Sequence, residues 1–376
     1  MQFSFTEQQT DFRDAVRQML DRECTAADLR AVFDAAVGPD GGTGTAADGE
    51  DSPSPASVRT PRWKALAEMG VVGLTVPERH GGLGLTDLDL VLLLEEAGRA
   101  ALPEPLLETT ALAAPLLART GLGPEHGTET GALSSQWLPL IAAGEAAAAI
   151  GLSGLPAVPG AVGADVFVLE HTPPEGGTEL HAVPADEVGV TPVASLDPTR
   201  RLGTVAWAPA PNTLVAAGSD AQSALAVLAD RAAVGTAAEL VGLADRMITM
   251  AADYAKERKQ FGRAIGSFQA VKHLLAGAQV QLEFARPVTY AAAWSLAHRT
   301  PDASRRASMA KAYAAEAATE AARVALQVHG AIGYTWECDL HLFLKRAWAL
   351  APAWGDAAEH RSRVLASVVA ERAEQA

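Results

Sequence analysis

From Ala221 to the C-terminus the sequence consists of long segments rich in alanine and leucine, and this feature restricts the possible fold more than any other. The segments stop near Gly262, Thr300 and Gly330, and the last one runs to the end of the chain. Alanine and leucine are strong helix formers, and helices joined by short loops pack antiparallel to their neighbours. The sequence therefore predicts a helical bundle over residues 216–376.

The residues before this bundle divide into two zones of different character. Residues 1–145 show helical periodicity, for example in Phe12, Val16 and Leu20, which follow one another at steps of four. Residues 146–215 instead contain short valine-rich runs broken by proline and glycine, a pattern typical of strands. We therefore expect a mostly α protein with three parts: an N-terminal helical domain, a small, shortened β-domain and the C-terminal bundle.

Residues 35–61 interrupt the first zone with glycine, proline, serine, threonine and aspartate and with almost no large apolar side chain. A segment of this composition has too little apolar surface to bury, so we expect a mobile surface loop. The sequence does not indicate a function for it.

The composition excludes several classes of protein. A formal net charge of −15 argues against nucleic acid or an anionic membrane as the main partner. Cys24 and Cys338 form neither a disulfide framework nor a metal-binding spacing, and they fit a reducing compartment. The first residues lack the basic and apolar regions of a signal peptide, and the most apolar stretch, 140–152, is too short to span a bilayer. We therefore expect a soluble cytoplasmic protein without membrane insertion.

One cluster of cations and aromatic residues stands between two of the predicted bundle helices. Residues 257–273 read ERKQFGRAIGSFQAVKH, and we expect Gly262 to end the first helix and Ser267 to cap the second. A structural explanation is sufficient, since cations stabilise a helix C-terminus and phenylalanines can close a corner. A phosphate site is the functional explanation, because Arg258 has a fork of donors, Gln269 lies in the first turn, and free N–H groups favour an anion.

A second glycine-rich helix end follows at residues 326–339, which read LQVHGAIGYTWECD. We expect the helix to end at Gly330, and Gly333 lets the backbone approach another group closely. Gln327 and His329 lie in the last helical turn. The sequence leaves two explanations of His329 open, a half-buried or exposed capping histidine and a member of a ligand site.

Taken together, these segments resemble the acyl-CoA dehydrogenase family. YAKERKQFGRAIGSFQAVKH looks like the family signature that begins Arg-x-x-Phe-Gly, and QVHGAIGY looks like its Gln-x-x-Gly-Gly-x-Gly turn, with Ala331 in place of the second glycine. FSFTEQQTDFRDAVRQML and LAEMGVVGLTVPERHGGLG match its N-terminal helical domain, and DPTRR at 197–201 resembles the end of its β-domain. The resemblance covers nearly the whole chain apart from residues 35–61.

The resemblance implies a fold, a cofactor and partners. The fold is an N-terminal helical domain, a middle β-domain and a C-terminal four-helix bundle, in subunits that form dimers of dimers with FAD at their interfaces. The implied reaction is α,β-desaturation of an acyl-CoA thioester, with an electron-transfer acceptor protein as a further partner. The residues that would contact the FAD of a neighbouring subunit are Arg258, Phe261, Gln269, Gln327, Gly330 and Ala331.

The sequence departs from the family at the catalytic base. The reaction removes an α-proton while a β-hydride passes to the flavin, and it needs a carboxylate at the α-carbon. Many members place a glutamate in a Tyr-Glu-Gly-Thr stretch, but ungapped counting from Arg346 finds Trp354–Gly355 there, and Ala232 falls where other members place theirs. The remaining base candidates are Asp356, Asp230 and Glu239. A helix cap is the ordinary explanation for the first, and surface charges or ion pairs for the other two.

The β-domain is the second departure. Family members carry a Thr-Glu-Pro…Gly-Ser-Asp stretch that holds the isoalloxazine ring, and here Ser153 is the only hydroxyl left near its place. Both departures fit one subunit of a heterotetrameric dehydrogenase whose partner supplies the flavin cradle and the glutamate. The alternatives are a self-sufficient homotetramer that uses Asp356 or Glu239, and a non-catalytic paralogue that binds acyl-CoA or flavin. The identity of the acyl group is not predicted.

Overall fold

The structure is a computed structural model that describes residues 4–37, 59–120 and 128–374. Most of the expected loop over 35–61 therefore lies outside the described residues. The chain divides into two compact units, each described by itself. The first comprises Met1–Leu29, Asp87–Leu102 and Asp230–Ala376, and the second comprises Arg30–Thr86 and Pro103–Ala229.

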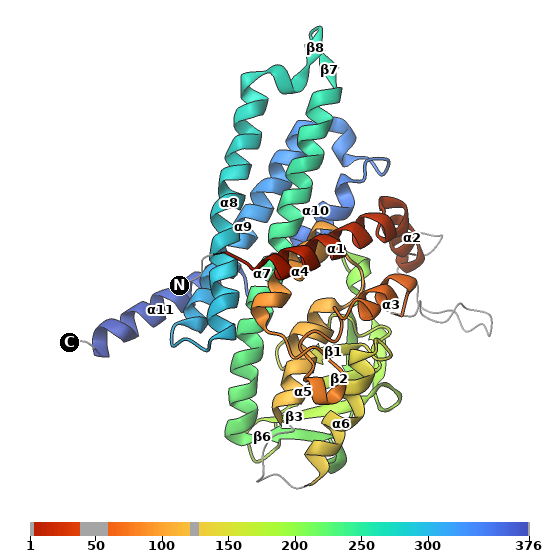
Figure 1. The fold of residues 1–376 in the computed structure, drawn as a ribbon, viewed down its shortest axis with the longest axis vertical. Helices are drawn as coiled ribbons and strands as arrows, with labels where there is room; N and C mark the ends of the chain where they lie inside the picture. Colours follow the sequence, from red (N-terminus) through yellow and green to blue (C-terminus); the bar gives the residue numbers. More distant parts are fainter. Residues whose placement is uncertain (1–3, 38–58, 121–127, 375–376) are drawn as a thin grey trace. The chain divides into compact units, whose positions relative to one another are not determined.

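The fold is mostly helical with small β-sheets, which confirms the predicted fold class (Figure 1). The α-helices of the described residues are α1 (Glu7–Glu23), α2 (Ala26–Val37), α3 (Pro61–Glu68), α4 (Asp87–Arg99), α5 (Ala114–Thr120), α6 (Thr128–Ala142), α7 (Gly218–Glu257), α8 (Gln269–Ala297), α9 (Ala303–His329), α10 (Leu340–Leu350) and α11 (Ala357–Glu374). The strands are β1 (Ala148–Gly151), β2 (Val166–His171), β3 (Glu179–Pro184), β4 (Gly189–Pro192), β5 (Gly203–Ala206), β6 (Leu214–Ala217), β7 (Lys259–Gln260) and β8 (Arg263–Ala264). Leu107–Ala113 is a π-helical segment, η2.

The helices α8 and α9 pack along each other in the first unit. Alanines at helical spacing on α9 are fully buried, among them Ala307, Ala314 and Ala321. Leu282 and Ala285 of α8, which packs along α9, are also fully buried. Because an alanine side chain is a single methyl group, helices approach closely along such a stripe. The alanine-rich composition therefore specifies packing as well as helix propensity.

The connection between α7 and α8 differs from the expected helical corner. The helix α7 ends at Glu257 rather than near Gly262, and β7 and β8 form a short antiparallel hairpin. Its two turn residues have positive φ, +54° at Phe261 and +79° at Gly262. Positive φ at both central residues is the geometry of a type I′ turn, whose twist matches that of the flanking strands. The glycine therefore completes a hairpin turn instead of ending a helix.

The predicted cap of α8 is wrong. The Ser267 hydroxyl donates to the Ala264 carbonyl at 2.7 Å, so it serves the short turn that follows the hairpin. The N-cap position belongs to Phe268, which makes no side-chain hydrogen bond to the helix. The first turn of α8 therefore begins without a side-chain cap.

Two glycines let α4 cross α7 at very close range. A Cβ atom on Gly98 would lie 2.0 Å from the carbonyl oxygen of Glu239, and one on Gly242 would lie 1.9 Å from the carbonyl oxygen of Glu95. These distances are far inside van der Waals contact, so no larger residue fits at either position. The close crossing carries the polar side chains of α4 into the interior of the unit.

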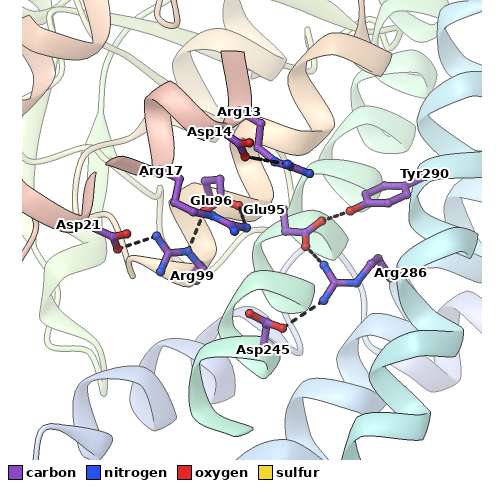
Figure 2. A network of polar contacts seen from close by, with 10 residues as sticks. All are labelled: Arg13, Asp14, Arg17, Asp21, Glu95, Glu96, Arg99, Asp245, Arg286 and Tyr290. Carbon is purple, nitrogen blue, oxygen red and sulfur yellow. Dashed lines mark hydrogen bonds and ion pairs between the residues drawn. The ribbon is translucent and has the colours of Figure 1, made fainter. Parts of the chain in front are cut away.

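Two consecutive carboxylates of α4, Glu95 and Glu96, are buried there, with exposed fractions of 5% and 1% (Figure 2). Arg17 of α1 donates to both oxygens of Glu96, at 2.5 and 2.9 Å. Arg99 donates to Glu96 at 2.7 Å and also to Asp21 of α1 at 2.7 Å. Glu96 is therefore held by two guanidinium groups.

Glu95 has a separate set of partners on the bundle side (Figure 2). It accepts hydrogen bonds from Arg286 and, at 2.5 Å, from the hydroxyl of Tyr290, both on α8. Arg286 also donates to Asp245 of α7 at 3.2 Å, and burial raises the pKa of Asp245. The network thus joins α1, α4, α7 and α8 through paired charges, which is the arrangement that a buried charge requires.

The second unit contains the larger sheet. Its strand order is β1-β2-β3-β6, with β1 and β2 parallel and the other pairs antiparallel, while β4 and β5 form a separate antiparallel pair. Phe167, Leu169 and Val183 are among the residues of its core. A buried ion pair of 2.9 Å joins Arg62 of α3 to Glu104. Within the described ranges, no helix of either unit is long and apolar enough to cross a membrane.

Candidate functional site

The two segments singled out by the sequence meet at one end of the bundle in the first unit. Tyr254 lies in the last turn of α7, and His329 is the last residue of α9. Their ring centroids are 4.5 Å apart and their planes are inclined by only 16°. The helix end before the hairpin and the helix end before the glycine-rich turn are therefore in direct contact.

The hairpin between α7 and α8 exposes the side chains that the sequence analysis singled out there. Phe261, at the turn, is 91% exposed, and its ring meets that of Phe268 edge to face at 6.0 Å. The guanidinium of Arg263 lies 4.1 Å above the Phe268 ring. Arg258 is exposed, and its side chain makes no hydrogen bond or ion pair with any residue that the structure describes. Of these two arginines, Arg258 is the one whose charge is available to a ligand.

The start of α8 adds backbone donors beside Arg258. Phe268 provides no side-chain cap, and the first amide bonded along the helix is that of Lys272, which donates to the Phe268 carbonyl at 3.2 Å. The amides of residues 269–271 therefore have no partner within the helix. Free amides at a helix N-terminus attract anions, and the exposed Gln269 lies among them.

The glycine-rich turn after α9 is compact. Gly330 has a φ of +63° and donates its N–H to the Leu326 carbonyl. A Cβ on Gly333 would lie 3.0 Å from Cδ1 of Leu326 and 3.1 Å from Cβ of His329, so the turn rests on the helix end. Gln327 and Ala331 are exposed beside it. A ligand at this end of the bundle can therefore contact backbone as well as side chains.

His329 is buried, with an exposed fraction of 8%, rather than a half-buried or exposed cap. Its Nδ1–H donates to the Ala325 carbonyl at 2.8 Å, which fixes the orientation of the ring. Burial lowers the pKa of His329, so the ring is neutral at pH 7. The histidine therefore packs against the glycine-rich turn, where Gly333 lies close to its Cβ.

The composition of this end of the bundle fits a dinucleotide. A guanidinium and free helix amides suit a pyrophosphate, an exposed aromatic ring suits a purine, and an exposed amide side chain offers both donor and acceptor. These groups come from exposed residues of two helix ends within one unit. Exposed ligand groups of this kind are suited to a ligand that another chain also binds.

The segment at the expected base position, between α10 and α11, has an unusual backbone. Trp354 has a φ of +60° and Gly355 a φ of +100°. A left-handed conformation costs a residue with a side chain roughly 1–2 kcal/mol, and only glycine adopts it freely. A Cβ on Gly355 would also lie 2.9 Å from Nε2 of His360 and 3.2 Å from a carboxylate oxygen of Glu359. A glutamate at this position would therefore be strained both by the backbone conformation and by the contact with His360.

Two buried donors that the sequence analysis did not identify hold this turn. Lys311 of α9 is fully buried, and its Nζ donates to the carbonyls of Ala351 at 2.7 Å and Gly355 at 3.0 Å. His360 of α11 is also fully buried, and its Nε2–H donates to the Trp354 carbonyl at 3.0 Å. Burial lowers the pKa of Lys311 to about 8 and also lowers that of His360. A signal existed in the sequence, because Lys311 falls on the buried alanine stripe of α9.

The three base candidates lie in different surroundings. Asp356 is exposed, and its Oδ1 accepts the amide of Glu359 at 2.8 Å, as an N-cap of α11 does. Asp230 accepts from the hydroxyl of Ser304 at 2.9 Å, and burial raises its pKa. Glu239 lies on α7 where Gly98 of α4 crosses it. Asp230 and Glu239 are nine positions apart on one helix, roughly 13 Å, so they do not form a pair.

The connection between β1 and β2 in the second unit, residues 152–165, is tied to a neighbouring strand. Val158 pairs with Gly203 of β5, and the amide of Gly160 donates to the Arg200 carbonyl at 3.0 Å. Ser153 is exposed, and its amide donates to Glu170 at 2.8 Å. This connection therefore contributes one exposed hydroxyl near the start of the loop.

Comparisons with known proteins agree with this architecture. The family description "Acyl-CoA dehydrogenase, C-terminal domain" matches residues 223–369, and "Acyl-CoA dehydrogenase, N-terminal domain" matches residues 45–145. The acyl-CoA dehydrogenase IpdE2 of Mycobacterium tuberculosis is 35% identical over 292 residues, covering 76% of this chain and 79% of that protein. IpdE2 of Mycolicibacterium smegmatis is 34% identical, covering 81% and 87%.

Solved structures are similar over almost the full length. A variant of the Tcur3481-Tcur3483 steroid ACAD has a TM-score of 0.79 and 26% identity, covering 98% of this chain and 99% of that one. The ChsE4-ChsE5 complex from Mycobacterium tuberculosis has a TM-score of 0.79 and 25% identity, with the same coverage. The chain therefore belongs to the acyl-CoA dehydrogenase family, the oxidoreductases that act on acyl-CoA thioesters with FAD as cofactor.

Proposed function

We propose that this chain is one subunit of a heteromeric acyl-CoA dehydrogenase and that it serves a flavin held mainly by a partner chain of the same family. When FAD is bound, it accepts the hydride that leaves the β-carbon of the acyl-CoA. The partner supplies the carboxylate that takes the α-proton. The contribution of this chain is the exposed end of its bundle, with Arg258, Phe261, Gln269, Gln327, Gly330 and Ala331.

The strained turn at Gly355 is the observation that carries this proposal. Its φ of +100° and the nearby His360 Nε2 disfavour any side chain, including that of a glutamate, where the family places its base. Asp356, one residue later, is exposed and already accepts a backbone hydrogen bond. A chain with cofactor contacts but no base at this position fits the role of a supporting subunit.

The similarity to two-component enzymes supports the same role. Two of the similar structures are the ChsE4-ChsE5 complex and the Tcur3481-Tcur3483 steroid ACAD. We therefore infer a heterotetramer with a second acyl-CoA dehydrogenase chain, and an electron-transfer protein as the acceptor. Acyl-CoA thioesters of steroid fragments are the first substrates to test, with linear acyl-CoA thioesters for comparison.

The test is turnover of the chain alone and of the chain co-expressed in turn with other acyl-CoA dehydrogenase chains of its own genome. We expect no acyl-CoA oxidation by the chain alone and oxidation by one such pair. In that pair Asp356→Asn and Glu239→Gln should leave turnover unchanged. Asparagine caps a helix as well as aspartate does, so the first variant removes the charge and keeps the cap. Turnover by the chain alone that is lost in either variant would refute the proposal in favour of a self-sufficient enzyme.

A further inference from the structure

The stacked rings of Tyr254 and His329 connect the two proposed cofactor segments. Tyr254 lies next to the hairpin segment, and His329 lies next to the glycine-rich turn. The rings come from α7 and α9, whose contact at this point is otherwise not implied by the sequence. The centroid distance of 4.5 Å and the inclination of 16° define a parallel stack. Aromatic pairs of this kind add energy beyond the area that they bury, and they restrict the relative positions of their two helices.

On the α7 side, the stack fixes the position of the Arg258 backbone. The amide of Arg258 donates to the carbonyl of Tyr254 at 2.9 Å, so Arg258 lies one helical turn beyond the stacked ring. The amide of Ile265 then donates to the Arg258 carbonyl at 2.8 Å and closes the hairpin on that residue. The backbone of Arg258 is therefore held between Tyr254 and the hairpin, while its side chain is exposed.

On the other side the stack supports the glycine-rich turn. The ring of His329 is oriented by its bond to the Ala325 carbonyl at 2.8 Å, and a Cβ on Gly333 would lie only 3.1 Å from the Cβ of His329, a tight contact. Gln327 lies two residues earlier in the same helical turn. A change in the position of the His329 ring would therefore move the turn and Gln327 relative to α7.

We propose that the Tyr254–His329 stack fixes the position of the segment with Arg258 relative to the segment with Gln327. Both rings are then positioning residues for the flavin. This inference rests on the proposed function, since it concerns how this chain meets a flavin held mainly by the partner. The stack holds Arg258 and Gln327 at a fixed separation, so that one bound dinucleotide engages both at once.

The flavin is removed from the co-expressed pair, and the affinity of the pair for FAD is then measured by titration. The titration is made well below the unfolding temperature of each variant, which is measured separately. Tyr254→Leu keeps most of the buried volume without a planar face, and His329→Ala removes the other ring. Each should weaken FAD binding about two- to tenfold, the range expected for one aromatic pair. Tyr254→Phe keeps the stack and should bind FAD like the wild type. The double variant should be no weaker than the weaker single variant, because both changes remove the same stack.

The matched control is the stack of Trp294 and His298, which has a similar geometry of 4.2 Å and 20°. It lies toward the other end of α8, roughly 40 Å along the helix from Gln269. His298→Ala should therefore leave FAD affinity unchanged.

The outcomes separate the two proposals. If Arg258→Ala weakens FAD binding while Tyr254→Leu and His329→Ala do not, the inference is overturned and the proposed function stands. The inference also fails if His298→Ala weakens binding as much as His329→Ala, since the effect would then be general. If Arg258→Ala itself leaves FAD affinity unchanged, or if no pair binds FAD, both proposals are contradicted.

Discussion

Two groups of arginines in the first unit lie in contrasting environments. Around Glu95 and Glu96, Arg17, Arg99 and Arg286 are paired with buried carboxylates (Figure 2). At the end of the bundle, Arg258 is exposed and has no partner among the described side chains. A charged side chain that stabilises the fold is paired with an opposite charge in the same chain. A charged side chain that binds a ligand is paired only when the ligand is bound. This contrast predicts opposite effects of similar substitutions.

The largest expected effect is on the stability of the network. Glu96→Ala leaves Arg17 and Arg99 without their central carboxylate and should lower the free energy of unfolding by about 3–5 kcal/mol. Urea unfolding of the chain measures this value. Glu371→Ala is the control, because it removes an exposed partner of Arg305 and should cost about 0–1 kcal/mol. Equal losses in the two variants would remove the distinction between buried and exposed pairs.

The second largest effect is on FAD binding, which should weaken without a loss of stability. Arg258→Ala should change the free energy of unfolding by no more than about 0.5 kcal/mol, as exposed substitutions usually do. In the co-expressed pair it should weaken FAD binding roughly ten- to a hundredfold, since a hydrogen bond to a charged group contributes about 1.5–3 kcal/mol. A flavin titration and a denaturant titration of the same preparation test both parts. A stability loss as large as that of Glu96→Ala would place Arg258 among the structural arginines.

The third prediction concerns the turn between α10 and α11, which buried donors hold in place. Gly355→Glu should lower the free energy of unfolding by about 1–3 kcal/mol, because it forces a side chain into a left-handed backbone against His360. It should also fail to produce turnover in the chain alone. Gly277→Glu is the control, since a Cβ on Gly277 meets nothing within 4 Å and its φ is not positive. Turnover by the Gly355→Glu chain would show that the position is open after all.

The smallest expected effect is on pH dependence. Burial lowers the pKa of His329 and of His360 below the ordinary value of 6.5. At a pH near 6.5 and below, these two histidines bind more protons in the unfolded chain than in the folded one. Their contribution to stability is therefore complete above pH 6.5 and decreases as the pH falls through this value. Urea unfolding between pH 7 and pH 5 measures the decrease. His329→Phe keeps a ring and should make the decrease smaller, and an unchanged profile would mean that this histidine does not contribute.

The sequence predicts the parts of the molecule that repeat along a helix or a strand. The alanine stripe of α9, the strand-forming runs within 146–215 and the end of α9 at Gly330 follow from local composition, whereas the predicted helix end at Gly262 does not, because a hairpin forms there. The structure agrees with the predicted fold class, and the comparisons agree with the family. Local patterns are sufficient here because each element buries one regular face.

The parts that the sequence did not predict depend on contacts between distant residues. No periodicity indicates that Tyr254 stacks on His329, or that Lys311 donates to the carbonyl of Gly355. The expected cap at Ser267 was wrong because a hairpin precedes α8, and its hydroxyl bonds to the Ala264 carbonyl instead. A lone lysine on an alanine stripe is a pattern that can be searched for, whereas the stack becomes visible only when the helices are assembled.

The most direct test of the account is the flavin content of the purified chain, alone and co-expressed with a partner chain. We predict that the chain alone carries no stoichiometric FAD, and that a pair does so with wild-type Arg258 but not with Arg258→Ala. One FAD per chain in the protein purified alone would contradict the claim that the flavin is held mainly by another chain.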